Sequence, residues 1–374
     1  MEELSTVKNY ITVTHNENPA KRESNFELLR IFSMVIIITH HLLVQGISNY
    51  ELGSFSNKIT GAIMFPGGRI GVALFFMLTG YFLIGKKKTS VKRVFLETIF
   101  YGWFLSLFLI IPYSLDKICG FSFNYCSLKA IFRKILVPVS SGRWWFVTAY
   151  CLLILTVPYI NLFLEKLNKS GFKFFIFISW FFWYSADTFL GADIGLIPAF
   201  FFYIFGAYFR LYSSKKKNIA LNLFSAVFLW GLISIYYFHF DHAVELNSKK
   251  QEIVKLLFYF FTHSFFIPLC AWNLFSIFSS IKLKYNNFIN TVASTTFGVY
   301  LIHVSSVKTV FYRDFFKINE QYLSPFFPLW AILDLTVMFS LCAIIDYFRL
   351  KFIEPKMIKK ADAIFEKMKK RFFS

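Results

Sequence analysis

The chain has 374 residues, of which 56% are hydrophobic and only 16% are charged, and its mean hydropathy is +0.54. Soluble domains hold roughly 45–50% apolar and about 25% charged residues, so this composition excludes a soluble globular protein. The formal net charge of +19 would suit a nucleic-acid-binding protein, but the lysines and arginines stand in short clusters between apolar segments. The charge therefore indicates membrane topology, and no nucleic-acid partner is expected.

Apolar segments of about twenty residues, the length a helix needs to cross a bilayer, follow one another along the chain. In chain order they predict ten spans: 25–45, 68–85, 94–113, 144–164, 173–190, 194–212, 219–240, 253–278, 288–307 and 326–348. The longest stretch between two spans covers residues 114–143, which leaves no room for a separate catalytic domain. We therefore predict an all-α polytopic membrane bundle of about ten transmembrane helices, with any chemistry in or at the membrane.

Basic residues are concentrated in alternate connecting segments. They cluster at 86–93, 166–173, 210–217 and 282–284, and again after residue 349. Because cytoplasmic loops carry an excess of lysine and arginine, this pattern predicts that both chain ends lie in the cytoplasm. The chain is therefore divided into a cytoplasmic polar tail over 1–24, a transmembrane domain over 25–349 and a tail over 350–374. The polar tail lacks the apolar core of a signal peptide.

The tail over 350–374 is basic and amphipathic. Apolar residues such as Met357, Ala361, Ile364 and Met368 recur at spacings of three and four, with lysines and arginines between them. Such a helix can lie on an anionic membrane surface, so the lipid bilayer is an expected partner. The alternative is a frayed basic tail that only enforces topology.

The first predicted span contains four ionisable residues, Glu27, Arg30, His40 and His41. Ionisable groups inside a span are costly and are often functional. On a helix, Arg30 and His41 lie about 20° apart on one face and about 16 Å apart along the axis, whereas His40 lies about 80° from Arg30. Glu27 is one turn before Arg30 and can form an ion pair with it.

Each of these residues also has an ordinary structural explanation. An arginine near a span end can extend its charge to the membrane surface, and a buried histidine can simply bond another helix. The combination of Arg30 and His41 on one face favours a functional role. Histidine is suited to take a proton from a hydroxyl near neutral pH, so His41 is predicted to be a general base.

Cysteines and histidines give no metal-binding pattern. The five cysteines are scattered without a C-x-x-C motif, which favours free thiols, although Cys119 and Cys126 share a loop and could form a disulfide. Adjacent His40 and His41 diverge by about 100° on a helix, and His239 and His242 sit in or near an outer loop with no carboxylate cluster in liganding register. We therefore expect no metal.

Five motifs in order resemble acyltransferase family 3, the integral-membrane acyltransferases that acylate sugars and surface polymers in bacteria. The first motif, acidic-x-x-Arg-x10-His, is matched by Glu27, Arg30 and His41, and the second, G-V-x-x-F-F-x-x-S-G-Y, by Gly71, Val72, Phe75, Phe76, Gly80 and Tyr81. The third, W-F-x-x-x-Y, is matched by Trp145, Phe146 and Tyr150, and the fourth, Y-L-x-H, by Tyr300 and His303. The closing I-E-x-P signature resembles the stretch that ends in Glu354 and Pro355. Thr79 replaces the usual serine of the second motif and keeps a hydroxyl.

One loop departs from the family. Many members carry an R-x-x-R pair after the second span, whereas this chain has Lys92 and Arg93, preceded by Lys86 to Lys88, and Glu97 where a second arginine would stand. This departure affects which residues of the loop contact the donor, and it does not affect the expected fold.

The resemblance implies an O-acyltransferase of the bacterial cell membrane. The expected donor is cytoplasmic acyl-CoA, usually acetyl-CoA, and the expected acceptor is a hydroxyl of a surface polysaccharide or lipid-linked sugar. His41 would be the base, Arg30 would hold the donor and Glu27 would fix Arg30. The expected binding residues are Lys92 and Arg93 in the loop, and Tyr81, Trp145, Tyr150, Tyr300 and His303 in the pocket.

Two other classes of protein share these features. A secondary transporter for a sugar or lipid-linked intermediate could use Arg30 and His41 as a proton or anion path. A polysaccharide polymerase would also have about ten spans and many aromatic residues. The motifs of the first two spans favour the acyltransferase over both, and the aromatic pocket residues could equally be ordinary packing residues.

Overall fold

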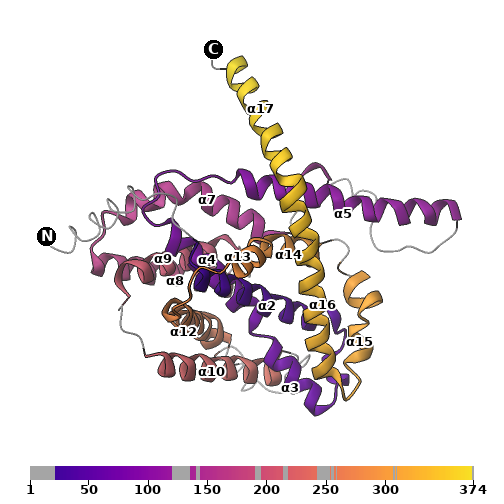
Figure 1. Ribbon diagram of the computed structural model, residues 1–374. Coiled ribbons are helices and arrows are strands. Elements are labelled where there is room, and N and C mark those ends of the chain that lie inside the picture. The colour runs from indigo at the N-terminus through magenta and orange to yellow at the C-terminus, as the bar shows by residue number, and fades with distance from the viewer. Residues whose placement is uncertain are drawn as a thin grey trace.

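A computed structural model describes residues 22–119, 135–139, 144–189, 195–213, 218–241, 253, 257, 259–305, 308 and 310–372. Over these residues the chain is helical and contains no strand, which confirms the predicted all-α class (Figure 1). The main helices are α2 (Ser24–Gly46), α3 (Phe55–Met64), α4 (Gly67–Leu83), α5 (Lys92–Cys119), α7 (Trp145–Leu164), α8 (Lys169–Phe189), α9 (Leu196–Tyr212), α10 (Ile219–Tyr236), α12 (Ile267–Ser280), α13 (Asn287–Ser294), α14 (Thr296–His303), α15 (Ile318–Gln321), α16 (Phe327–Phe348) and α17 (Glu354–Phe372).

Each predicted span coincides with a helix, but not each with one long helix. Five described helices are long and apolar enough to cross a membrane: Ser24–Gly46, Phe55–Leu83, Trp145–Leu164, Ile219–His239 and Phe327–Arg371. The span predicted over 288–307 is divided at Thr295 into α13 and α14. The span predicted over 253–278 contains the π-helical turn Thr262–Phe266 before α12. The number of crossings and their orientation remain predictions.

Helix α4 lies between α2 and α9, and glycines allow the close contact on both sides. A Cβ at Gly71 would lie 2.6 Å from the carbonyl oxygen of Ser33 on α2. A Cβ at Gly80 would lie 1.9 Å from the carbonyl oxygen of Tyr203 on α9, and Gly206 meets Met77 in the same way. Such small residues let membrane helices approach at backbone distance. The glycines of the second motif therefore fix how α2 is positioned against α4.

A buried ionic cluster joins α5, α16 and α17. Arg349 is 2% exposed, and its guanidinium bonds Asp346 at 2.6 Å, Glu354 at 2.6 Å and Glu97 at 2.9 Å. The hydroxyl of Tyr101 donates to Asp346 at 2.7 Å. Glu354 of the closing signature is thus a partner of a buried arginine, and Glu97 forms a further ion pair with that arginine. Removing one member of such a cluster leaves an uncompensated buried charge.

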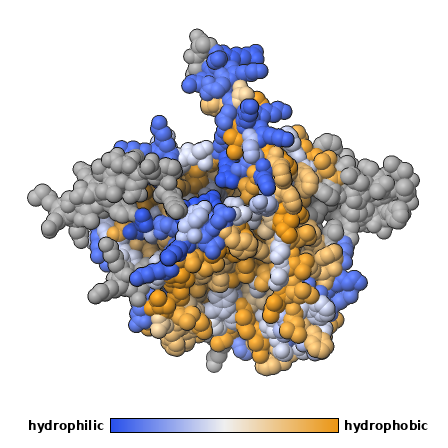
Figure 2. Space-filling view, in the orientation of Figure 1, coloured by the Kyte–Doolittle hydropathy of each residue, from blue (hydrophilic) through white to orange (hydrophobic). Residues whose placement is uncertain are grey.

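The C-terminal tail forms the predicted helix. Helix α17 continues from α16 and projects from the bundle at the end opposite α3 and α15 (Figure 1). Apolar residues cover much of the bundle surface on the face shown in Figure 2, whereas hydrophilic residues dominate the projecting helix. Ile364 and Phe365 are exposed, 51% and 67%. Contact of this helix with a membrane surface is still a prediction.

Some predictions fall on residues that the structure does not describe. These are most of the polar tail over 1–24 and most of the loop over 114–143. Cys151, Cys270 and Cys342 are buried free thiols, as expected. The side chains of Cys119 and Cys126 lie outside the described residues, so their pairing is not tested.

Candidate active site

The candidate site is built along α2, which carries both predicted catalytic residues. The helix has no proline, and its only glycine is Gly46 at the end, where a Cβ would clash with Ile318. Near its start, the guanidinium of Arg30 donates to the carboxylate of Glu27 at 2.5 Å, one turn away. The predicted ion pair therefore forms. Three turns later His40 and His41 are partly buried near the other end of the same helix.

The first of two cavities opens beside Arg30. It has a volume of about 450 Å³ and lies between α2, α4, α5, α7 and the α13–α14 pair. We call it the arginine cavity, because Arg22, Arg30 and Arg93 line it, together with Glu23, Glu27, Glu97, Thr79, Tyr150, Tyr300 and apolar residues. The side chains of Arg22 and Arg93 are 44% and 52% exposed, and that of Arg30 is 28% exposed. The cavity thus has a cationic mouth and a deeper arginine.

The arginines of this cavity are paired with carboxylates, but the carboxylates do not use all of their N–H donors. Glu27 bonds Arg30 and lies 3.9 Å from the guanidinium of Arg22. Arg93 bonds Glu354 at 2.7 Å. A guanidinium has five N–H donors, so each arginine keeps donors for another anion. Such a forked array suits the phosphate groups of a ligand.

The second cavity opens beside His41. It has a volume of about 420 Å³ and is lined by residues of α2, α4, α7, α9, α10, α12 and the π-helical turn before α12. We call it the histidine cavity, because His40, His41 and His263 line it, with Arg69, Thr262, Trp145, Tyr259, Tyr300 and apolar residues. Its lining includes no aspartate or glutamate among the residues that the structure describes.

Hydrogen bonds to His303 orient His41. Nδ1 of His303, which is fully buried, lies 2.6 Å from the carbonyl oxygen of Val299, so this nitrogen must carry a proton. In the neutral ring, Nε2 of His303 is then an acceptor, and it lies 3.0 Å from Nδ1 of His41. His41 must therefore donate from Nδ1, which leaves its Nε2 with a free lone pair. This is the tautomer that a general base needs.

His40 has a different set of contacts. Its Nδ1 donates to the carbonyl oxygen of Phe65 at 2.7 Å, and its ring covers Gly68, where a Cβ would lie 2.5 Å from it. Phe65 and Pro66 form the break between α3 and α4, and no backbone amide among the described residues bonds the carbonyl of Phe65 there. His40 satisfies a carbonyl of this break, which gives it a structural role.

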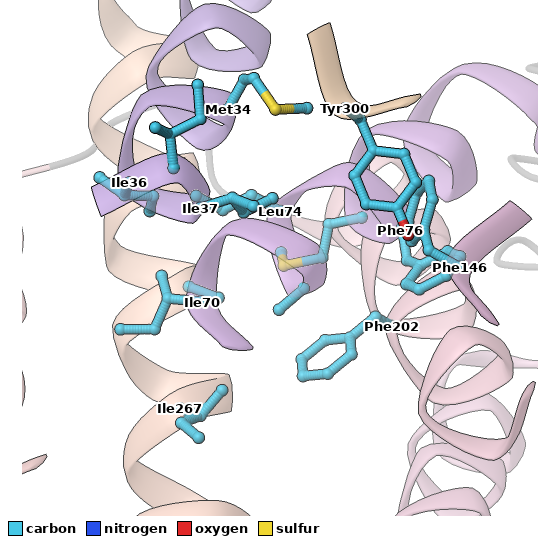
Figure 3. Packing of buried hydrophobic residues seen from close by; sticks show 14 of the residues in the cluster. Met34, Ile36, Ile37, Ile70, Leu74, Phe76, Phe146, Phe202, Ile267 and Tyr300 are labelled. Carbon is cyan, nitrogen blue, oxygen red and sulfur yellow. The ribbon is translucent and has the colours of Figure 1, made fainter. Parts of the chain in front are cut away.

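The two cavities meet at a shared wall. Ile37, Val72 and Tyr300 line both of them. In Figure 3, Ile37 lies beside Leu74, and the ring of Tyr300 lies near Phe146, at a centroid distance of 5.3 Å. The two cavities thus lie against each other where side chains of α2, α4 and α14 line both.

The remaining predicted site residues divide between cavity and scaffold. Tyr150 lines the arginine cavity and Trp145 the histidine cavity. Tyr81 lines neither; its hydroxyl accepts from Arg210 at 2.5 Å, and it packs on Phe26. Lys92 is also outside both cavities and pairs with Asp362 of α17. His303 lines neither cavity and lies behind His41, to which it is hydrogen-bonded.

Arg69, Thr262 and His263 also line the histidine cavity and were not predicted as site residues. Arg69 interrupts the apolar second span and could have been found as an ionisable residue inside it. His263 also lies inside a predicted span, so the same signal could have identified it. Thr262 carries no such signal, because threonine is common in apolar helices.

No group of three or more potential metal ligands of the His, Cys, Asp and Glu types occurs in the described part of the chain. The histidines of the site bond each other or backbone carbonyls. The arrangement is an imidazole with a free Nε2 in one chamber and a group of arginines with free N–H donors in the other.

The family model of the acyltransferase domain, acyltransferase family 3, matches residues 23–351, and the chain belongs to this family. The match includes α2 to α16 and therefore both cavities. No curated protein and no solved structure matched the chain.

Proposed function

We propose that the protein transfers an acyl group, in the simplest case acetyl, from cytoplasmic acyl-CoA to a hydroxyl of a surface polysaccharide or lipid-linked sugar at the bacterial cell membrane. The observation that supports this most is the pair of cavities meeting at Ile37, Val72 and Tyr300. A reaction between a charged soluble donor and a glycan acceptor needs two entrances and one meeting point.

The arginine cavity fits the donor. Coenzyme A carries several phosphate charges, and Arg22 and Arg93 at the mouth would attract them. Arg30 lies deeper, held in its rotamer by Glu27, and would bind a phosphate or guide the pantetheine arm. The apolar residues Met34, Val72 and Phe75 would enclose the uncharged arm and bring the thioester to the shared wall.

The histidine cavity fits the acceptor. Nε2 of His41 would take the proton of the acceptor hydroxyl while the hydroxyl oxygen attacks the thioester carbonyl. The tetrahedral intermediate would then expel the thiolate of coenzyme A, and the imidazolium of His41 would return the proton to that sulfur. The ester forms as the thioester breaks, so no other reactant is needed. His303 would hold His41 in the reactive tautomer throughout.

The decisive experiment compares surface glycans from cells with and without the gene by mass spectrometry. We expect ester-linked acyl groups that are lost with the gene and restored by the wild-type gene. Membranes containing the protein should consume acetyl-CoA in the presence of acceptor. An unchanged acyl content with altered glycan length would indicate a polymerase, and an accumulated lipid-linked intermediate with normal acylation capacity would indicate a transporter.

The proposal also requires the two cavities to open on opposite sides of the membrane. We expect a cysteine placed at Lys87 to be protected from a membrane-impermeant thiol reagent in intact cells, and one placed at Ser54, at the other end, to be labelled. A background without the native cysteines prevents confusion of the signal. The opposite labelling pattern would place the donor site outside and contradict the two-sided mechanism.

A further inference from the structure

The histidine cavity holds more polar groups than proton transfer by His41 requires. Arg69 of α4, and Thr262 and His263 of the π-helical turn, also line it. Arg69 is close enough to His263 and His40 to interact electrostatically with both imidazoles. These groups therefore form one cluster, which we call the Arg69 cluster.

Arg69 is a cation without an acidic partner in the described part of the chain. It takes part in none of the ion pairs there, and the lining of its cavity contains no carboxylate. A half-buried arginine in a membrane protein is costly unless an anion compensates it. In the arginine cavity, by contrast, each lining arginine has a glutamate within 4 Å.

The start of α4 adds backbone donors beside this cation. Pro66 breaks the helix, so the first backbone bond after the break runs from Ile70 to Pro66, and the amides of Gly67, Gly68 and Arg69 make no such bond among the described residues. Side chains hold the break open: the indole N–H of Trp230 donates to the carbonyl oxygen of Ile63, and His40 bonds that of Phe65. Free amides at a helix start attract anions.

The π-helical turn contributes an independent observation. Thr262 is fully buried, yet its hydroxyl has no hydrogen-bond partner in the described part of the chain. Buried hydroxyls are almost always bonded, so an unbonded one on a cavity wall points to a ligand group. His263, which is 6% exposed, donates from Nδ1 to the carbonyl oxygen of Tyr259, which leaves Nε2 to accept a hydrogen bond.

These groups together match one kind of ligand. A guanidinium and free amides bind an anionic group, while a threonine hydroxyl and an imidazole acceptor bind hydroxyls beside it. We propose that the acceptor carries a carboxylate or phosphate near the hydroxyl that is acylated, and that Arg69 with the start of α4 binds this anion. The proposal rests on the proposed function and narrows its acceptor to acidic or phosphate-bearing glycans.

Binding can be tested without turnover. We would measure the thermal unfolding temperature of the purified protein in detergent with methyl β-glucuronoside, glycerol 3-phosphate or the neutral methyl β-glucoside. We expect stabilisation by one or both anionic probes and none by the neutral one. Arg69→Gln should abolish the shift and Arg69→Lys should keep part of it, whereas Lys58→Gln, a nearby charge removal outside both cavities, should change nothing.

Turnover with acetyl-CoA then gives the second readout. Arg69→Gln should raise the KM for the preferred anionic acceptor by about tenfold or more, the range for a charge-assisted hydrogen bond, and leave the KM for acetyl-CoA unchanged. Preference for the carboxylate or the phosphate probe identifies the anion.

The possible failures are distinguishable. Acyl transfer to the neutral glucoside at the same rate as to either anion would overturn the anion proposal and leave acyl transfer standing. An equal loss of activity with all acceptors in Arg69→Gln would have the same meaning. Stabilisation by phosphatidylglycerol but by neither soluble probe would mean that a lipid headgroup occupies the site, which also overturns it. Anion-dependent stabilisation with no acyl transfer to any acceptor would support the anion site and contradict the proposed function.

Discussion

The arginine and histidine cavities have similar volumes, but they differ in which groups hold their charged and titratable side chains. In the arginine cavity the cations Arg22, Arg30 and Arg93 are held by carboxylates, and the mouth is exposed. In the histidine cavity the imidazoles are oriented by backbone carbonyls and by each other, and Arg69 has no described acidic partner. Under the proposed function, the first chamber would exchange a charged ligand and the second would keep His41 in one tautomer.

The largest expected effect comes from replacing His41, the proposed general base. His41→Ala should lower the rate of acyl transfer by about 10²–10⁴-fold, the usual contribution of a positioned base. His40→Ala should be much milder, because its ring nitrogen serves the carbonyl of Phe65. Transfer assays on membranes with matched protein amounts check this. An inactive His40→Ala beside a near-normal His41→Ala would reverse the roles, and normal activity in both would remove the catalytic claim.

Arg30→Lys tests the deep end of the arginine cavity. An ammonium lacks the planar fork that can bond Glu27 and a phosphate at the same time, so we expect kcat/KM for acetyl-CoA to fall by about 10- to 100-fold. Steady-state kinetics with varied donor would measure it. Glu27→Gln serves as the matched variant and should have a smaller effect in the same direction. Full activity of Arg30→Lys would show that only charge matters at this position.

His303 tests whether the histidine cavity depends on tautomer control. His303→Ala removes the acceptor for Nδ1 of His41, so we expect kcat to fall about tenfold with little change in the KM for the acceptor. His303→Gln should recover part of the loss, because its amide oxygen can accept the same hydrogen bond. Equal kcat values for the alanine and glutamine variants would contradict an orienting role.

The smallest expected effect is at the mouth of the arginine cavity. Arg93→Gln should raise the KM for acetyl-CoA about two- to fivefold at low ionic strength and less at high salt, since the side chain is exposed. Lys92→Gln should change it less, because Lys92 pairs with Asp362 outside the cavity. If both substitutions lower kcat and leave KM unchanged, the loop takes part in catalysis instead of attracting the donor.

Part of the site could be predicted from α2 alone. The alignment of Arg30 and His41 on one face follows from helical periodicity, and the pairing of Glu27 with Arg30 follows from their spacing. The second-motif glycines were recognised by pattern, and the structure gives their reason as backbone contact with α2 and α9. The sequence did not show which residue of the loop after the second span lines a cavity. Lys92 and Arg93 are neighbours in sequence, but of these two only Arg93 lines the arginine cavity.

The sequence by itself determined the helical class, the approximate helix bounds and the separation of about 16 Å between Arg30 and His41, because these depend on hydrogen bonds and apolar patterns within one segment. Tertiary structure decided the rest. It placed His303 of α14 behind His41, Glu97 beside Arg349 and Arg69 in a chamber lined by no described carboxylate. Contacts between distant helices depend on how side chains pack, and no local pattern in either helix specifies them.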